Sequence, residues 1–197
     1  DMSKRIKKIG IIGAGQMGNG IAHICALAGF SVYLVDVGKE QLAKATVTIG
    51  GNLDRQVRKK TIKAKDKSAA MKRIKTGLKY DGLKNCDLVI EAATEDEQVK
   101  KDIYKQLCPL LKPSTILASN TSSISITRMA AHTDRPEQYV GMHFMNPVPL
   151  MELVELIRGI ATDEKTYRCC REFIEKLGKK PVNAEDFPAF IVNRILL

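Results

Sequence analysis

The stretch IKKIGIIGAGQMGNGIAHICALAGFSVYLVD, residues 6–36, decides the fold of this chain. Residues 6–12 form an apolar run that ends at a glycine and predict a β-strand. Residues 16–28 carry apolar side chains at helical spacing, and Gly29 suits the position just after a helix. Residues 31–35 predict a second strand. Strand, glycine turn, helix and strand in this order predict a βαβ unit.

The turn in this unit reads GAGQMG and has the pattern G-x-G-x-x-G, which in this context is typical of dinucleotide binding. Gly13 permits a tight turn, Gly15 lets the backbone approach a pyrophosphate, and Gly18 lets the helix pack on the sheet. The helix N-terminus favours the phosphate charge. Asp36 ends the second strand and can accept hydrogen bonds from ribose hydroxyls, which favours NAD over NADP, although the nearby Lys39 leaves NADP open.

Strands and helices alternate along the rest of the chain. We expect further strands at residues 86–92, 116–119, 139–144 and 153–157. We expect further helices at residues 39–65, 66–75, 96–108 and 163–177. This alternation predicts an α/β fold with a Rossmann-type, doubly wound, mostly parallel sheet. The two helices after Asp36 form an inserted basic hairpin.

The last residues, AFIVNRILL at 189–197, have a helical and apolar pattern. Because such a helix normally packs on another element, we expect residues 1–186 to form the dinucleotide-binding domain. We expect residues 187–197 to be the truncated start of an all-helical domain that forms dimers.

The net charge of +10 is unevenly distributed. Residues 39–81 hold thirteen Lys and Arg against four Asp and Glu, which accounts for +9 of the total. Such a block suits either a polyanionic partner or a solvated helix face. No aromatic residue is interleaved before Tyr80, which weakens a single-stranded nucleic acid interpretation.

The composition also argues against several other classes of protein. Every apolar run is far shorter than the roughly 20 residues that a membrane helix needs, so we expect no membrane contact. The chain has five cysteines, an odd number, without a C-x-x-C pair. The histidines show no metal-ligand spacing either. A reducing, cytoplasmic location without a disulfide framework or a bound metal fits this pattern.

Four motifs in order carry a resemblance to a known family. They are GAGQMG with Asp36, SNTSS at 119–123, GMHFMNPVP at 141–149 and FIVNR at 190–194. Together they resemble the 3-hydroxyacyl-CoA dehydrogenases, including the short bacterial 3-hydroxybutyryl-CoA dehydrogenases of fatty-acid and butanoate metabolism. The resemblance extends from Lys4 to Leu197. It implies reversible NAD-dependent oxidation of (S)-3-hydroxyacyl-CoA to 3-oxoacyl-CoA.

The resemblance also implies roles for four side chains. His143 matches the catalytic base, and a neutral imidazole suits proton removal from an alcohol near neutral pH. Glu155 matches its acidic partner, with Glu152 as the competing carboxylate. Ser122 matches a serine that hydrogen-bonds the substrate's reacting oxygen, and Asn193 matches an asparagine near the catalytic histidine and the substrate. The alternatives are a packed histidine, a solvated glutamate, a serine that caps a helix and a polar asparagine between domains.

A helix is expected to begin near Ile124, and Ser123 is a better candidate than Ser122 for its N-cap. Glu95 and Lys100 match positions that contact the nicotinamide ribose, although they equally suit the charged start of an exposed helix. Asn146 is expected to fix the histidine loop. The full set of expected cofactor contacts is Gly13, Gly15, Gln16, Met17, Gly18, Asp36, Glu95, Lys100, Asn120 and Asn146.

The basic block gains a specific role from the same resemblance. Arg55 and Lys59 are four residues apart and share one helix face. They match basic positions that contact the phosphate-bearing end of acyl-CoA, so they join Ser122 and Asn193 as expected substrate contacts. The resemblance further implies a homodimer and no nucleic-acid partner.

Three other functions remain as alternatives. A β-hydroxyacid dehydrogenase has a related fold but generally uses a catalytic lysine in place of this histidine motif. A crystallin-like relative would bind the dinucleotide without catalysis, which the joint presence of Ser122, His143, Glu155 and Asn193 opposes. A nucleic-acid binder would use residues 39–81.

Overall fold

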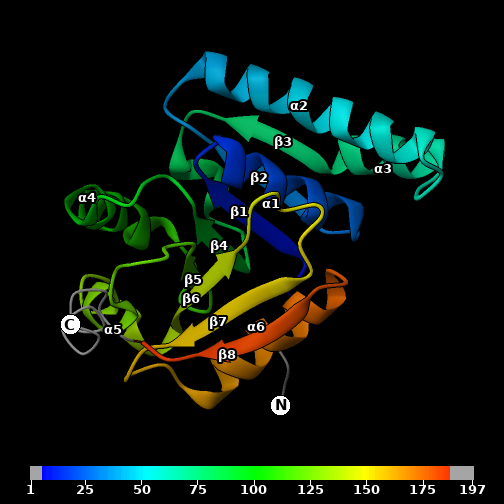
Figure 1. The fold of residues 1–197 in the computed structure, drawn as a ribbon. Helices are drawn as coiled ribbons and strands as arrows, with labels where there is room; N and C mark the ends of the chain where they lie inside the picture. Colours follow the sequence, from blue (N-terminus) through cyan, green and yellow to red (C-terminus); the bar gives the residue numbers. More distant parts are fainter. Residues whose placement is uncertain (1–5, 187–197) are drawn as a thin grey trace, which may run out of the picture.

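The computed structural model describes residues 6–186 and contains one sheet of eight strands. Their order across the sheet is β3-β2-β1-β4-β5-β6-β7-β8 (Figure 1). The strands are β1 Lys8–Ile12, β2 Ser31–Val35, β3 Ile74–Gly77, β4 Leu88–Glu91, β5 Ile116–Ser119, β6 Tyr139–Phe144, β7 Leu153–Arg158 and β8 Lys180–Ala184. The first six are parallel, β7 is antiparallel to β6, and β8 is parallel to β7. The order 3-2-1-4-5-6 is that of a Rossmann fold, which confirms the predicted fold class.

Helices cover both faces of the sheet. The α-helices are α1 Gln16–Leu27, α2 Lys39–Arg58, α3 Ala64–Arg73, α4 Glu97–Leu107, α5 Ile126–Ala130 and α6 Glu164–Lys176. The 3-10 turns are η1 Tyr80–Leu83, η2 Cys108–Leu110 and η3 Pro136–Gln138. Apolar residues of α1, α2, α3 and α6 share one core with the sheet, and those of α4 and α5 share the other. Within residues 6–186, no helix is long and apolar enough to cross a membrane.

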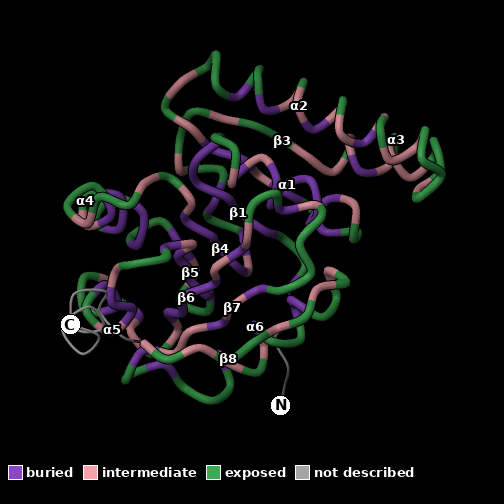
Figure 2. Tube along the Cα trace, viewed as in Figure 1, coloured by how far each residue is buried: buried purple, intermediate pink, exposed green. Residues whose placement is uncertain are grey.

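Alternation along the strands divides the sheet between these two cores. Ile9 and Ile11 of β1 belong to the core under α1, whereas Ile12 belongs to the core under α4. All three side chains are almost fully buried. The buried trace follows the centre of the sheet in Figure 2, and exposed residues lie mainly on the helices and loops.

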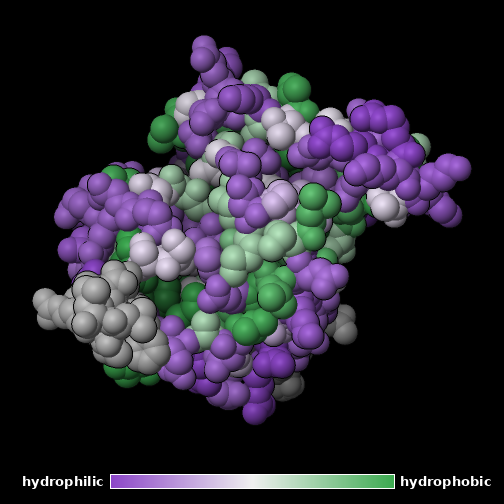
Figure 3. All heavy atoms as spheres, in the orientation of Figure 1, coloured by the Kyte–Doolittle hydropathy of each residue, from purple (hydrophilic) through white to green (hydrophobic). Residues whose placement is uncertain are grey.

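The basic hairpin is real, but its boundaries differ from those predicted. The long helix α2 ends at Arg58, not near residue 65, and the backbone then turns through Lys60, whose φ is 61°. Helix α3 ends at Arg73 because the chain continues as strand β3, which the sequence did not predict. The hairpin of α2 and α3 projects from the sheet and is hydrophilic on the side seen in Figure 3.

Strand β8 also escaped prediction. It is an edge strand that contains Pro181, and a proline is tolerated there because only one side of the strand pairs with a neighbour. Lys180 donates its backbone N–H to the Glu152 carbonyl at 2.8 Å, which aligns β8 with β7.

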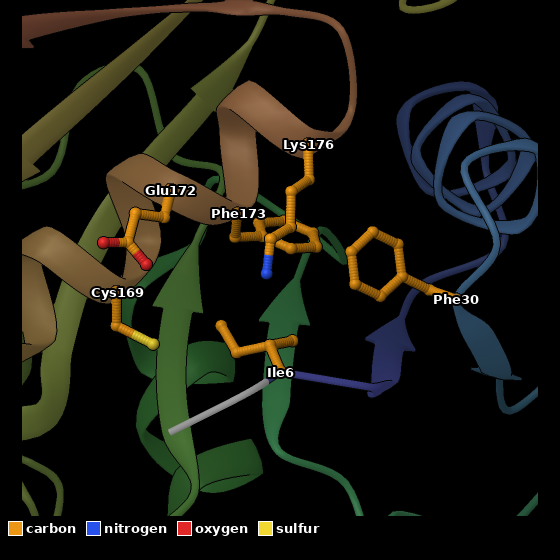
Figure 4. A pocket seen from close by; sticks show the side chains of 6 residues that line it. All are labelled: Ile6, Phe30, Cys169, Glu172, Phe173 and Lys176. Atoms are coloured by element: carbon orange, nitrogen blue, oxygen red, sulfur yellow. The ribbon is translucent and has the colours of Figure 1, made fainter. Parts of the chain in front are cut away.

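Helix α6 makes an aromatic contact with Phe30, the residue that precedes β2. Phe173 meets Phe30 edge to face, with ring centroids 5.1 Å apart. Figure 4 shows both rings beside Ile6, around a hollow that Cys169 and Lys176 also line. This hollow measures about 10 Å³, close to the space of a single water, so it does not form a ligand site.

Candidate active site

The glycine turn requires glycine for steric reasons at two positions. Gly13 has a φ of 105°, and a Cβ there would lie 2.6 Å from the carbonyl oxygen of Ala92. A Cβ on Gly18 would lie 1.6 Å from the carbonyl oxygen of Gly13 and 3.7 Å from the side chain of Ile11. The turn and the first turn of α1 therefore fit together only without these side chains.

The same turn leaves the N-terminus of α1 available to an anion. A Cβ on Gly15 would meet nothing within 4 Å. No side chain caps this helix end, and its first turn contains no acidic residue. Gln16 is exposed and Met17 is half-buried. A diphosphate is the kind of group that such open backbone N–H groups and the helix dipole bind, so the geometry fits the dinucleotide predicted from the sequence.

Asp36 lies beside this turn at the end of β2. Its Oδ2 accepts the backbone N–H of Ala14 at 2.8 Å, and its Oδ1 accepts that of Gly38 at 2.9 Å. Each carboxylate oxygen keeps a further lone pair for a ribose hydroxyl. Asp36 therefore both fixes the glycine turn and presents a negative charge at the place where the adenosine ribose of a bound dinucleotide is expected.

The strand order reverses at β1, next to the glycine turn. Strand β1 is flanked by β2 and β4, and the helices that follow β1 and β4 cover opposite faces of the sheet. Ligands of such sheets bind at the carboxyl edge at this point. Glu95 and Asn120 follow β4 and β5 and so lie at that edge. Asn120 accepts the backbone N–H of Phe144 through its Oδ1 at 2.8 Å, which ties β5 to β6 beside His143.

His143 and Glu155 face each other across two antiparallel strands. They are register partners in β6 and β7, and His143 Nδ1 lies 3.4 Å from Glu155 Oε1. The side chains are 23% and 38% exposed, so both reach solvent at the rim of the sheet. Glu152 precedes β7 and is not the register partner of His143.

Ser122 lies in a loop that Glu95 holds. The Glu95 carboxylate accepts hydrogen bonds from Thr121 Oγ1 at 2.8 Å, the Ser122 backbone N–H at 3.2 Å and Ser123 Oγ at 2.9 Å. Neither Ser122 nor Ser123 caps the following helix. Instead α5 begins at Ile126, and Ser125 caps it by accepting the Arg128 N–H at 3.2 Å. The expectation that Ser123 is the cap was therefore wrong by two residues.

A cavity of about 120 Å³ brings three of the predicted catalytic side chains together. Ser122, His143 and Glu155 line it, along with Asp186. Asn193 lies outside the described residues. Asn146 is exposed in the loop after β6, next to a cis bond to Pro147.

Two groups of predicted site residues lie elsewhere. Arg55 and Lys59 are exposed at the C-terminal end of α2 and do not line this cavity. The Lys100 side chain is only 1% exposed, and its ammonium lies 2.6 and 2.7 Å from the two oxygens of Glu91. Lys100 is therefore buried beside Glu91 and, like Arg55 and Lys59, does not line this cavity.

Sequence reasoning missed the network that surrounds Lys100. Glu91 Oε1 also accepts hydrogen bonds from Ser119 Oγ at 2.8 Å and from the Tyr104 hydroxyl at 3.1 Å. Tyr104 in turn meets the hydroxyl of Tyr139 at 2.7 Å. Burial raises the pKa of Tyr104 well above its usual value, and the adjacent Tyr139 and Glu91 raise it further. The available signal was a carboxylate, Glu91, that ends an otherwise apolar strand.

Across residues 6–186, no group of three or more His, Cys, Asp or Glu side chains is placed to hold a metal ion. No disulfide forms there either, and burial raises the pKa of the Cys86 thiol to about 11. The polar side chains that line the cavity belong to one histidine, three acidic residues and three hydroxyl-bearing residues.

Comparison with known proteins agrees with this geometry. The chain is 62% identical over 196 residues to the 3-hydroxybutyryl-CoA dehydrogenase of Bradyrhizobium diazoefficiens, and the match covers 100% of this chain and 67% of that protein. The crystal structure of (S)-3-hydroxybutyryl-CoA dehydrogenase from Ralstonia eutropha superposes with a TM-score of 0.91 at 47% identity, over 97% of this chain and 68% of that one. The 3-hydroxybutyryl-CoA dehydrogenase of Escherichia coli K12 gives 0.91 at 39% identity, over 97% of this chain and 40% of that one.

Residues 8–187 match the protein family described as "3-hydroxyacyl-CoA dehydrogenase, NAD binding domain". This match covers both the glycine turn and the hairpin that carries His143 and Glu155. The chain therefore belongs to the 3-hydroxyacyl-CoA dehydrogenase family and contains its NAD-binding domain.

Proposed function

We propose that this protein catalyses the reversible NAD-dependent oxidation of (S)-3-hydroxyacyl-CoA to 3-oxoacyl-CoA, with short acyl chains such as 3-hydroxybutyryl. The single observation that carries the proposal is the pairing of His143 with Glu155 in a cavity that Ser122 also lines. The relatives named as 3-hydroxybutyryl-CoA dehydrogenases support the short chain.

The oxidation removes a proton from the 3-hydroxyl oxygen and a hydride from C3, and a C=O double bond forms. NAD, when bound, accepts the hydride. His143 takes the proton, for which a neutral imidazole is suited near neutral pH. Glu155 orients the ring through Nδ1 and stabilises the imidazolium by its negative charge, as carboxylates do for catalytic histidines elsewhere.

Ser122 and Asn193 are proposed to contact the reacting oxygen. In the reverse direction they donate hydrogen bonds to the 3-keto oxygen while negative charge develops on it. In the described part of the chain the Ser122 hydroxyl is exposed and has no hydrogen-bond partner, so it is available to a substrate.

The cofactor is proposed to lie across the glycine turn. Gly13, Gly15, Gln16, Met17 and Gly18 surround its diphosphate, and Asp36 accepts its adenosine ribose hydroxyls. Glu95, Asn120 and Asn146 lie toward the nicotinamide side. Lys100 is proposed to act on the same side, where the Glu91 carboxylate holds its ammonium in place.

Arg55 and Lys59 are proposed to attract the phosphates of the CoA moiety. Both are exposed at the C-terminal end of α2, within the basic block of residues 39–81 whose net charge is +9, and the Lys59 backbone N–H donates to the Arg55 carbonyl at 3.0 Å. Such a field steers anionic ligands inward. We further propose a cytoplasmic homodimer whose contacts come from the region that begins at residue 187.

The test is the disappearance of NADH absorbance on addition of acetoacetyl-CoA and its longer homologues. We expect turnover in the unsubstituted protein, greatest for the shorter chains. We expect His143→Ala to bind NAD normally and to lose roughly 10²- to 10⁴-fold in kcat, the range that a general base contributes. Unchanged turnover in His143→Ala would refute the assignment of the base.

A parallel titration separates the polyanion alternatives. We expect CoA to bind with an affinity that Arg55→Ala and Lys59→Ala reduce. Binding of an oligonucleotide with a steep salt dependence, together with no effect of these variants on CoA, would favour a nucleic-acid binder instead.

A further inference from the structure

The carboxylate of Asp186, which is about 60 positions away in sequence, accepts hydrogen bonds from the first turn of α5. Its Oδ1 accepts the backbone N–H of Ile126 at 2.7 Å, and its Oδ2 accepts that of Thr127 at 2.8 Å. Ser125 donates its hydroxyl to the same Oδ2 at 3.3 Å. Both oxygens are engaged, so Asp186 and the start of α5 hold each other in one arrangement.

Glu95 binds the N-terminal end of the segment 121–127, which leads into α5. Its carboxylate accepts hydrogen bonds from Thr121, Ser122 and Ser123, as described above. Residues 121–127 are thus hydrogen-bonded at one end to Glu95, which follows β4, and at the other end to Asp186, which follows β8. The Ser122 side chain itself takes no part in either set of bonds, so its position follows from that of the backbone that carries it.

Asp186 also shares the catalytic cavity with the residues that the proposed function uses. Ser122, His143 and Asp186 all line the same space of about 120 Å³. His143 stands on the sheet, whereas Ser122 stands on a loop. A small displacement of the loop therefore changes the separation of the two groups, and reactions are sensitive to displacements of this order.

We propose that Asp186 is a positioning residue, which holds the start of α5 so that Ser122 stays at the correct place opposite His143. The inference rests on the proposed function, because it concerns the efficiency of that reaction. Asp186 acts through hydrogen bonds to backbone N–H groups and does not touch the reacting atoms.

If Asp186 only stabilised the fold, replacing it would affect kcat no more than removing a similar helix cap elsewhere. Asp163 provides that matched control. Asp163 caps α6 by accepting the Thr166 N–H at 2.7 Å, and it does not line the cavity. Asp163→Ala therefore removes the same kind of bond from another helix. We expect Asp186→Ala to lower kcat by roughly 10-fold or more, with little change in the KM for NAD, while Asp163→Ala keeps its kcat.

Hydrogen exchange provides a readout that does not depend on turnover. We expect the amides of Ile126 and Thr127 to exchange faster in Asp186→Ala, and those around α6 to remain protected. Unchanged exchange at these two amides would overturn the proposed anchor.

A double-mutant cycle tests whether Asp186 works through Ser122. If it does, Ser122→Ala and Asp186→Ala together reduce kcat little more than Ser122→Ala alone. Multiplicative losses would overturn the inference, because they would show that the two residues act independently.

The conservative variant separates hydrogen bonding from charge. Asp186→Asn keeps one acceptor oxygen, so we expect it to recover part of the kcat lost in Asp186→Ala and to leave the pH profile unchanged. An Asn variant as slow as the Ala variant, with a shifted pH profile, would mean that the charge acts on His143 directly and would overturn the inference. Absence of turnover in the unsubstituted protein would overturn the proposed function as well, whereas full turnover in Asp186→Ala would overturn this inference alone.

Discussion

Glu155 of β7 lies directly opposite His143 of β6, and the antiparallel register places its Oε1 3.4 Å from the imidazole Nδ1. In the proposed reaction, the other ring nitrogen, Nε2, takes the proton of the substrate's hydroxyl group. Residues that face each other across neighbouring antiparallel strands are held at short range by the sheet itself. The pair therefore needs no loop to bring it together.

Replacing this carboxylate by an amide tests its role. We expect Glu155→Gln to reduce kcat by roughly 10²-fold, within the range that acid–base groups contribute, because a neutral amide does not stabilise the imidazolium. Steady-state kinetics with acetoacetyl-CoA and NADH give the measurement. Glu152→Gln is the matched control and should retain full activity, and the reverse pattern would identify Glu152 as the partner.

Two glycines in the turn should respond differently to alanine. At Gly18 the new Cβ would lie 1.6 Å from a backbone oxygen, so we expect Gly18→Ala to lose both thermal stability and NAD affinity. At Gly15 nothing lies within 4 Å, so Gly15→Ala should melt at the temperature of the unsubstituted protein yet bind NAD weakly. Thermal melts and NAD titrations distinguish the two. Normal NAD binding by Gly15→Ala would show that the diphosphate does not approach this turn.

Asp36 should decide between the two nicotinamide dinucleotides. We expect Asp36→Ser to weaken NAD binding about tenfold or more, since a hydrogen bond to a charged group contributes about 1.5–3 kcal/mol. The same change removes the repulsion of a 2′-phosphate, so the affinity for NADP should rise relative to NAD. Titration with both dinucleotides measures this. Asp81→Ser, an exposed change in η1, should alter neither affinity.

His23 should make stability fall in weakly acidic solution. Burial lowers the pKa of His23 below 6.5, the hydrogen bond that its Nε2 donates to Gln56 Oε1 partly opposes this, and Lys179 lowers it further. Its Nδ1 also has no partner in the described part of the chain. The unfolded chain therefore binds this proton more readily than the folded one, and the free energy of unfolding decreases as the pH falls below about 6.5.

Urea unfolding at a series of pH values measures that slope. We expect His23→Gln to flatten it, because the amide does not titrate and still offers a hydrogen bond to Gln56. The exposed His132→Gln should keep the slope of the unsubstituted protein. Carboxyl groups whose pKa is lowered, such as Asp87, change the free energy of unfolding only at a lower pH, so they do not affect the slope near pH 6. An unchanged slope in His23→Gln would contradict the assignment.

The buried pair of Lys100 and Glu91 should behave as a unit. Their side chains are 1% and 0% exposed, so Lys100→Met leaves an uncompensated carboxylate in the core. We expect this variant to lose about 3–5 kcal/mol of stability. The double variant Lys100→Met with Glu91→Gln should recover much of that loss, measured by urea unfolding. Arg168→Met, in an exposed pair with Glu164, should cost no more than about 1 kcal/mol.

Local signals explain how much of the fold could be predicted. The apolar run to Ile12, the glycine turn and the helix that ends before Gly29 lie next to one another in sequence, so spacing alone was sufficient. Strands β3 and β8 were missed because their side chains are largely exposed and their pairing partners, β2 and β7, lie far away in sequence. Edge strands of this kind have little apolar periodicity to detect.

The site was predictable only in part, for the same reason. His143 stood out through its motif, but the spacing did not distinguish Glu155 from Glu152. That choice depends on the register between β6 and β7, which the sequence does not state. The hydrogen bonds of Asp186 to residues 126 and 127 span about 60 positions of sequence. Because their donors are backbone N–H groups, no pattern of side chains predicts them.

The antiparallel turn from β6 to β7 has one more implication. The adenosine end of the dinucleotide is expected beside Asp36 at the first βαβ unit, whereas the proposed proton acceptor His143 and its partner Glu155 lie on β6 and β7, farther along the strand order. An engineer who changes the coenzyme preference through Asp36 need not disturb the groups that handle the proton. Redesign of the two halves is therefore separable, and variants selected for each property should combine without mutual interference.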